Sequence, residues 1–179
     1  IISPNGPYVI YNSSTITDVS GNNNSLADYN ELVDMSVELQ NVGSNNATSI
    51  DVLITSTDPY VTLINSAVNI PIINASQIAS IPTPFSFQVA FFVPDQHLAA
   101  FTLLMTDNLG NSWTSNLNVV INAPVLDQTN FAINDATLGN NNGVLDAGET
   151  LDLVIDITNL GHADISSLTA DLSCLSTYV

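Results

Sequence analysis

Apolar residues stand at every second position along several short stretches of this chain. The pattern is strict in residues 33–39, where Val, Met, Val and Leu alternate with Asp, Ser and Glu. Successive side chains of a β-strand point to opposite faces, so the pattern predicts a strand with one buried and one exposed face. One face of each of the stretches 50–54, 85–91, 99–105 and 113–121 is apolar in the same way.

Other parts of the chain indicate strands or breaks by their composition. Residues 8–17, 60–64 and 125–133 are rich in β-branched and aromatic residues, which favours strands. Residues 65–84 contain three prolines, the first of them Pro71, and we expect this passage to be irregular. No stretch has a helical period of apolar residues.

Short alternating strands separated by turn residues are typical of a two-sheet fold. The sequence therefore predicts an all-β protein, an antiparallel immunoglobulin-like β-sandwich. The expected core includes Trp113 and four aromatic residues of the alternating stretches: Phe85, Phe87, Phe91 and Phe101.

One segment of the chain occurs twice, 118 positions apart. Residues 21–61 and 139–179 align without a gap and are identical at 12 of 41 positions. Self-similarity at a fixed period indicates a repeated structural module. We therefore expect the end of a preceding linker at residues 1–7, a complete module at 8–122, and the first part of a second module at 123–179. A second module cut at that point leads us to expect that the chain is a piece of a longer protein.

The charge of the chain limits its partners. It has 17 acidic residues and no Lys or Arg, with a formal net charge of -17 at pH 7. Without basic side chains to neutralise phosphate, nucleic acid and anionic membrane surfaces are excluded as partners. No apolar run is long enough to insert into a membrane. Cys174, the one cysteine, is expected to be a small buried residue on a strand.

Several motifs together resemble the Ig-like modules of secreted Bacteroidetes proteins. The longest is Gly-Asn-Asn-Asn-Gly-x-Leu-Asp-x-Gly-Glu at 139–149, followed by an alternating strand and Asn-x-Gly at 159–161. Val-Pro-Asp at 93–95, the run at 107–113 and the junction at 122–126 belong to the same pattern. The chain is similar in particular to the non-catalytic region that follows the catalytic domain of gingipain-type cysteine peptidases. The resemblance implies a module exported by the type IX secretion system and displayed outside the cell.

The repeated loop is the best candidate for a binding site, and calcium is the candidate ligand. Calcium takes about six to eight oxygen ligands in irregular geometry, and carboxylate and amide side chains supply them. The two copies of the loop offer the following oxygen-bearing side chains: Asp135, Asn140, Asn142, Asp146 and Glu149 in the second, and Asp18, Asn22, Asn24, Asp28 and Glu31 in the first. The alternative is that the loop hydrogen-bonds to its own backbone and that Glu31 and Glu149 accept backbone N–H groups.

The sequence offers no catalytic group. His97 and His162 stand apart from each other in the two modules and are expected to be surface residues, and Cys174 occupies the repeat position of Ser56. Three hypotheses remain. The chain is a non-catalytic extracellular spacer whose partners are adjacent modules of the same polypeptide. Alternatively, it is an adhesion module with a protein or glycan partner at the cell surface. In the third, it is an accessory region of a gingipain-like peptidase.

Overall fold

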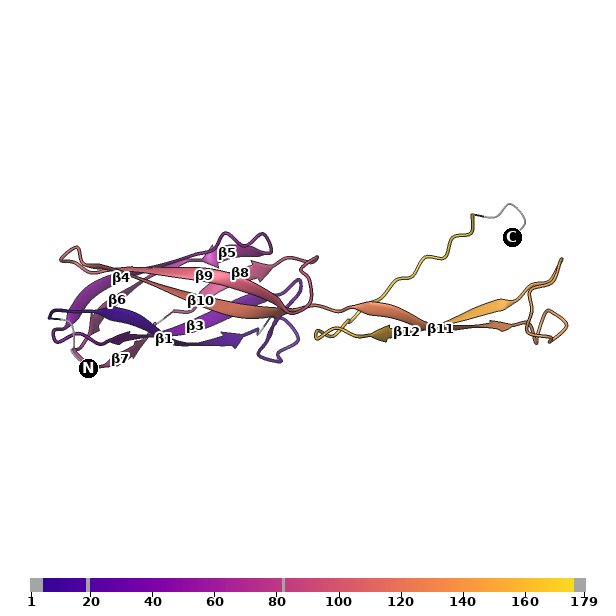
Figure 1. Cartoon of the computed structure of the whole chain (residues 1–179), viewed down its shortest axis with the longest axis horizontal. Coiled ribbons are helices and arrows are strands. Elements are labelled where there is room, and N and C mark those ends of the chain that lie inside the picture. Colours follow the sequence, from indigo (N-terminus) through magenta and orange to yellow (C-terminus); the bar gives the residue numbers. More distant parts are fainter. Residues whose placement is uncertain (1–4, 19, 82, 176–179) are drawn as a thin grey trace. The chain divides into compact units, whose positions relative to one another are not determined.

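The chain divides into two compact units, residues 1–123 and 124–179. The computed structural model describes residues 5–18, 20–81 and 83–175. Strands β1 to β10 belong to the first unit and the hairpin β11–β12 to the second (Figure 1). The first four residues of the expected linker, and Tyr178 and Val179 of the repeat, lie outside the described residues.

The first unit contains two sheets. In one, the strands are ordered β1 (Val9–Thr17), β3 (Leu32–Asn41), β8 (Phe85–Val89) and β5 (Val61–Asn65), and β7 (Ile78–Ser80) also pairs with β3. In the other, the order is β2 (Ala27–Asp28), β10 (Ser112–Asn122), β9 (His97–Thr106), β4 (Ala47–Thr55) and β6 (Ala67–Ile73). All pairs are antiparallel except β2 with β10.

The strand order confirms the immunoglobulin-like sandwich. An immunoglobulin domain has its first, second, fifth and fourth strands in one sheet and its third, sixth and seventh in the other. The sheet β1-β3-β8-β5 and the opposing run β10-β9-β4 reproduce that arrangement, with β2, β6 and β7 as additions.

The core lies between the two sheets, as the alternation predicted. Val33, Met35, Val37 and Leu39 of β3 are at most 1% exposed, and the apolar face of β9 is equally buried. The rings of Phe87 in one sheet and Phe101 in the other have centroids 5.1 Å apart, so they join the layers directly. Trp113 belongs to the same cluster.

The expectation for residues 65–84 was wrong in part, because β6 and β7 both form there. Pro71 lies within β6, which is an edge strand of its sheet. An edge strand has one side without ladder partners, so a residue that lacks an N–H is tolerated. Pro71 therefore indicated an edge strand, whereas Pro84 lies outside the strands as expected.

The second unit repeats the first hairpin of the first unit. Strands β11 (Leu126–Asn134) and β12 (Asp152–Asn159) pair antiparallel, from Leu126 opposite Asn159 to Asn134 opposite Asp152. The β1–β3 pairing runs in the same way from Val9 opposite Asn41 to Thr17 opposite Asp34. Each ladder has one irregularity, at Tyr11/Ser13 in the first and at Gln128/Asn130 in the second. These are equivalent positions, so the duplication includes the bulge.

Two further expectations concern residues near the ends of the chain. Gly6, assigned by sequence to the preceding linker, forms two hydrogen bonds with Ser44: its carbonyl accepts the Ser44 N–H, and its own N–H donates to Ser44 Oγ. Cys174 was expected to be buried on a strand, but it is exposed and lies outside the strands. No helix among the described residues is long and apolar enough to cross a membrane.

Candidate functional site

Asp18 organises the first Asn-rich loop, which joins β1 to β3. Its side chain is fully buried, and its two carboxylate oxygens accept the backbone N–H groups of Asn24, at 3.1 Å, and Ser25, at 2.9 Å. Burial raises the pKa of Asp18, but the backbone N–H groups together lower it by more, so its pKa lies below the usual value. The carboxylate thus serves as an anionic anchor for the loop backbone.

The two asparagines of the loop stabilise consecutive turns. The side-chain oxygen of Asn22 accepts the N–H of Asn24 at 3.0 Å, and that of Asn24 accepts the N–H of Leu26 at 2.7 Å. A side chain that bonds to the backbone two residues ahead forms an Asx turn, which is why Asn is favoured in such loops. The amide nitrogens of both asparagines donate to Asp28 Oδ2 at 2.9 Å.

Asp28, on β2, connects the loop to the neighbouring strand β10. Its other oxygen, Oδ1, accepts a hydrogen bond of 2.9 Å from Asn122 Nδ2 on β10. Asn122 Oδ1 in turn accepts from Gln96 Nε2 at 2.6 Å. Asp28 and Asn122 are 94 residues apart in sequence, and sequence analysis did not identify Asn122 as part of this network.

Glu31 closes the loop from its far end. Its two oxygens accept the N–H groups of Asn22, at 3.0 Å, and Asp28, at 3.3 Å. Burial raises the pKa of Glu31, and repulsion from the carboxylates of Asp28 and Asp18 adds to the increase. A Cβ on Gly21 would meet the Glu31 carboxylate and displace it from the N–H groups that it accepts, which favours glycine at this position.

The backbone of both loops uses left-handed conformations at the same places. Asn23, Ser25 and Asn30 have φ angles of 61°, 65° and 59°, and the equivalent residues of the second loop have 62°, 74° and 84°. The second loop has glycine at two of these positions, Gly143 and Gly148. The first loop has Ser and Asn there, and asparagine tolerates positive φ better than most residues.

The second loop repeats the hydrogen bonds of the first. Asn140 and Asn142 donate to Asp146 Oδ2 at 2.9 and 2.8 Å, and the N–H groups of Asn140 and Asp146 donate to Glu149 at 3.0 and 3.2 Å. Asp135 accepts the N–H of Asn142 at 2.9 Å, as Asp18 accepts that of Asn24. All ten residues proposed from the sequence therefore belong to two equivalent networks. Hydrogen bonds from the two asparagines lower the pKa of Asp146.

The oxygens of these loops already have hydrogen-bond donors. Both glutamates accept backbone N–H groups, as the alternative interpretation of the loop expected. Within the described part of the chain, no group of three or more His, Cys, Asp or Glu side chains is placed to hold a metal ion. Calcium binding stays a prediction. It would require the side-chain oxygens of these loops to give up hydrogen bonds and to coordinate the ion instead.

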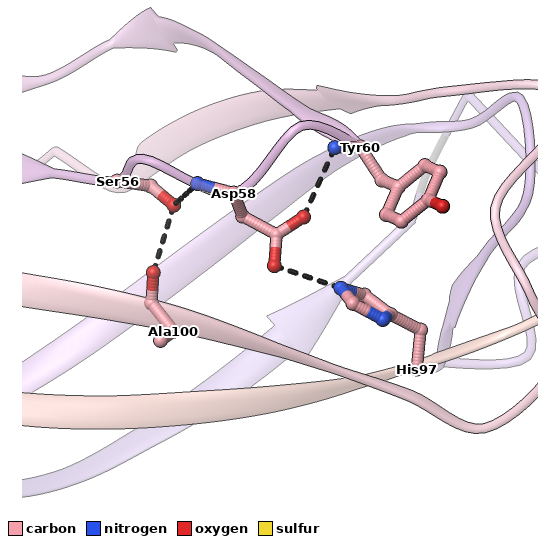
Figure 2. A network of polar contacts seen from close by, with 5 residues as sticks. All are labelled: Ser56, Asp58, Tyr60, His97 and Ala100. Atoms are coloured by element: carbon pink, nitrogen blue, oxygen red, sulfur yellow. Dashed lines mark hydrogen bonds and ion pairs between the residues drawn. The ribbon is translucent and has the colours of Figure 1, made fainter.

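A second polar network surrounds His97, at the start of β9 (Figure 2). His97 Nε2 lies 2.7 Å from Asp58 Oδ2, and Asp58 Oδ1 accepts the N–H of Tyr60 at 3.0 Å. Ser56 Oγ donates to the Ala100 carbonyl at 2.7 Å and accepts the N–H of Asp58 at 3.1 Å. A serine nucleophile must donate its proton to the imidazole, whereas this hydroxyl donates to a carbonyl. The group therefore fixes a turn, and sequence analysis missed the pairing because its members are 39 residues apart.

Exposed aromatic side chains lie beside this network. Phe91 and Phe92 are 71% and 73% exposed, and their ring centroids lie 5.9 Å from Tyr29 and 5.7 Å from Tyr60, respectively. Tyr60 also contacts the His97 ring. The expectation that Phe91 belongs to the core was wrong, because β8 ends at Val89 and the chain turns before the alternation reaches Phe91.

Two solved structures to which the chain is similar are distant from it in sequence. No protein-family model matches the chain, and no curated protein is similar to it in sequence. A CARDB domain from Pyrococcus furiosus, in complex with di-metal ions, is 12% identical with a TM-score of 0.41, and the match covers 68% of this chain and 93% of that one. BcpA, the major pilin subunit of Bacillus cereus, is 15% identical with a TM-score of 0.34, and the match covers 86% of this chain and 55% of the pilin.

Proposed function

We propose that this chain carries tandem immunoglobulin-like modules that serve as a non-catalytic structural spacer in a secreted or cell-surface protein. The observation that supports this is the duplicated hairpin and loop, alike in register, bulge and side-chain hydrogen bonds. In both copies, the charged and amide groups of the loop bond to the loop itself or to its own unit. Groups that bond within their own unit stabilise the shape of that unit. The partners of such a module are the adjacent modules of the same polypeptide.

An extracellular location fits the surface chemistry. A chain with 17 acidic residues and no Lys or Arg has no basic side chains with which its surface could bind phosphate groups. The motifs shared with gingipain-type peptidases support a role as an accessory region of such an enzyme, exported by the type IX system. That assignment rests on the sequence motifs alone.

Limited proteolysis tests the shape-holding role of the loop. An endoproteinase that cleaves before Asp has sites in the first loop at Asp18 and Asp28, which are both buried and hydrogen-bonded. We expect these two sites to stay intact while the enzyme cleaves before Asp171, which is exposed. Early cleavage before Asp28, seen by mass spectrometry, would contradict the proposal.

Calcium in the loops is the metal-binding part of the proposal. Three carboxylates, Asp18, Asp28 and Glu31, belong to one hydrogen-bonded loop without a basic side chain to offset them. A calcium ion would relieve their repulsion and would stabilise the folded form, because an ion that binds only that form raises the unfolding midpoint. Melting curves with calcium and with EDTA should therefore differ for the first unit.

The control for calcium is magnesium at the same ionic strength, which separates binding from general screening of the acidic surface. An Asp28→Asn variant should lose the calcium-dependent part of the shift, and an Asp51→Asn variant on the exposed face of β4 should keep it. Equal midpoints in calcium and EDTA would rule out the metal and leave the spacer role standing.

The exposed aromatic residues favour adhesion as a second candidate function. Two ring pairs, Phe91 with Tyr29 and Phe92 with Tyr60, include two exposed phenylalanines that are consecutive in sequence, and exposed aromatic residues contact the partner in many binding sites. On a glycan array, we expect any binding by the chain to fall about tenfold or more in a Phe91→Ala/Phe92→Ala variant. Leu109→Ala, at another site that is 77% exposed, is the matched control. Equal binding by both variants, or none by the native chain, would reject glycan adhesion.

A further inference from the structure

The apolar face of β12 is left uncovered in the second unit. Leu153, Ile155 and Ile157 are 39%, 41% and 42% exposed. Their equivalents in the first unit, Met35, Val37 and Leu39, are at most 1% exposed. The same hairpin therefore has its inner face buried in one copy and open in the other.

The edge of β12 is open as well. In the first unit, β3 pairs with β1 on one edge and with β8 and β7 on the other. Within the described residues, β12 pairs with β11 alone, in a sheet of two strands. An open edge next to an apolar face is the arrangement to which an extended segment adds as a further strand.

The first unit shows which segment fits. Phe85 lies opposite Met35, Ser86 opposite Asp34, and Phe87 opposite Val33. The equivalent positions in the second unit are Leu153 and Asp152 of β12, and Leu151, which directly precedes the strand. The fitting strand places large apolar rings beside the two leucines and a small hydroxyl residue beside the aspartate.

Charge argues against a second copy of the same hairpin as the occupant. The hairpin carries Asp127, Asp152 and Asp156 and no basic side chain. The symmetric antiparallel register of β12 with β12 of another molecule, centred on Val154, places Asp152 of each strand opposite Asp156 of the other, which is destabilising. The β8 segment, Phe-Ser-Phe-Gln-Val, has no charge.

We propose that β12 accepts an additional antiparallel strand with the β8 pattern, an uncharged segment in which aromatic or aliphatic residues alternate with small polar ones. The added strand pairs with residues 150–153, as β8 pairs with residues 32–35, and places its apolar side chains beside Leu151 and Leu153 on the same face. This inference depends on the duplication of the hairpin and not on the spacer role, on calcium or on adhesion.

A peptide corresponding to residues 83–90, flanked by Ser and Asn for solubility, tests the proposal on the full chain. We expect hydrogen exchange of amides in residues 150–155 to slow by about tenfold or more when the peptide is added. Exchange in β3 should stay unchanged, because its edge is already occupied. A peptide with both phenylalanines replaced by Ser should give no protection.

Two chain variants locate the binding face. Leu153→Asp, on the apolar face, should abolish the protection, whereas Val154→Asp, at the position equivalent to the outward Ser36, should keep it. If a variant fails to form the hairpin, the comparison of the two peptides on the native chain still decides. No protection by the native peptide, or equal protection by both peptides, would overturn the proposal. So would concentration-dependent dimerisation that protects residues 150–155 without peptide.

Discussion

Individual carboxylates in this protein are balanced by amide and hydroxyl groups in place of basic side chains. Hydrogen bonds from Ser13 and Asn12 lower the pKa of Glu38. Burial raises the pKa of Asp107, but the Asn111 side chain and nearby backbone N–H groups lower it overall. Hydrogen bonding to a charged carboxylate stabilises that form without a cation. At these carboxylates, Asn and Ser side chains thus supply the donors that Lys and Arg supply in other proteins.

Asp18→Asn tests this arrangement at the most buried carboxylate. The amide would place an N–H₂ group against a backbone N–H that now has an acceptor, at a cost of about 1–3 kcal/mol in the free energy of unfolding. The pKa of Asp18 is lowered on folding, so its contribution is complete above the unfolded value, near 3.8, and is lost as the pH falls through the folded value. The difference between native and variant should therefore be largest at neutral pH and shrink in acid.

Urea denaturation at several pH values measures this difference. Asp51→Asn is the matched control, since its exposed side chain accepts a hydrogen bond from Asn69, and an amide oxygen can accept that bond equally well. A variant as stable as the native chain at pH 7, or a difference that grows in acid, would show that Asp18 does not anchor the loop.

Sequence predicted those elements and contacts whose determinants are local. The period of two located β3, β9 and β10 and their buried faces, because alternation follows from strand geometry alone. The members of the Asn-rich loops were also found, because their bonds span fewer than ten residues. Asn122 and the His97–Asp58 pair were missed, since only the sandwich brings these distant residues together. Phe91 was misplaced because alternation does not reveal where a strand ends.

At the scale of the whole molecule, the two units contain the same hairpin in different environments. In the first unit, β3 has strands on both edges and a core over its apolar face. In the second, β12 has one strand partner among the described residues, and its side chains are exposed. A two-stranded hairpin without a packed face is marginally stable in water, whereas a sandwich of this size reaches about 5–15 kcal/mol.

Hydrogen exchange of the intact chain should therefore separate the two copies. Amides of β3 open only with the first unit, so we expect them to exchange about a thousandfold or more slowly than their equivalents in β12. The comparison is internal, because both strands have the same register, the same bulge and the same loop. Their backbone geometry is therefore matched, and the difference measures mainly what the sheet edge and the core contribute. Similar protection in β3 and β12 would mean that the hairpin is stable by itself, and it would remove the reason for β12 to accept another strand.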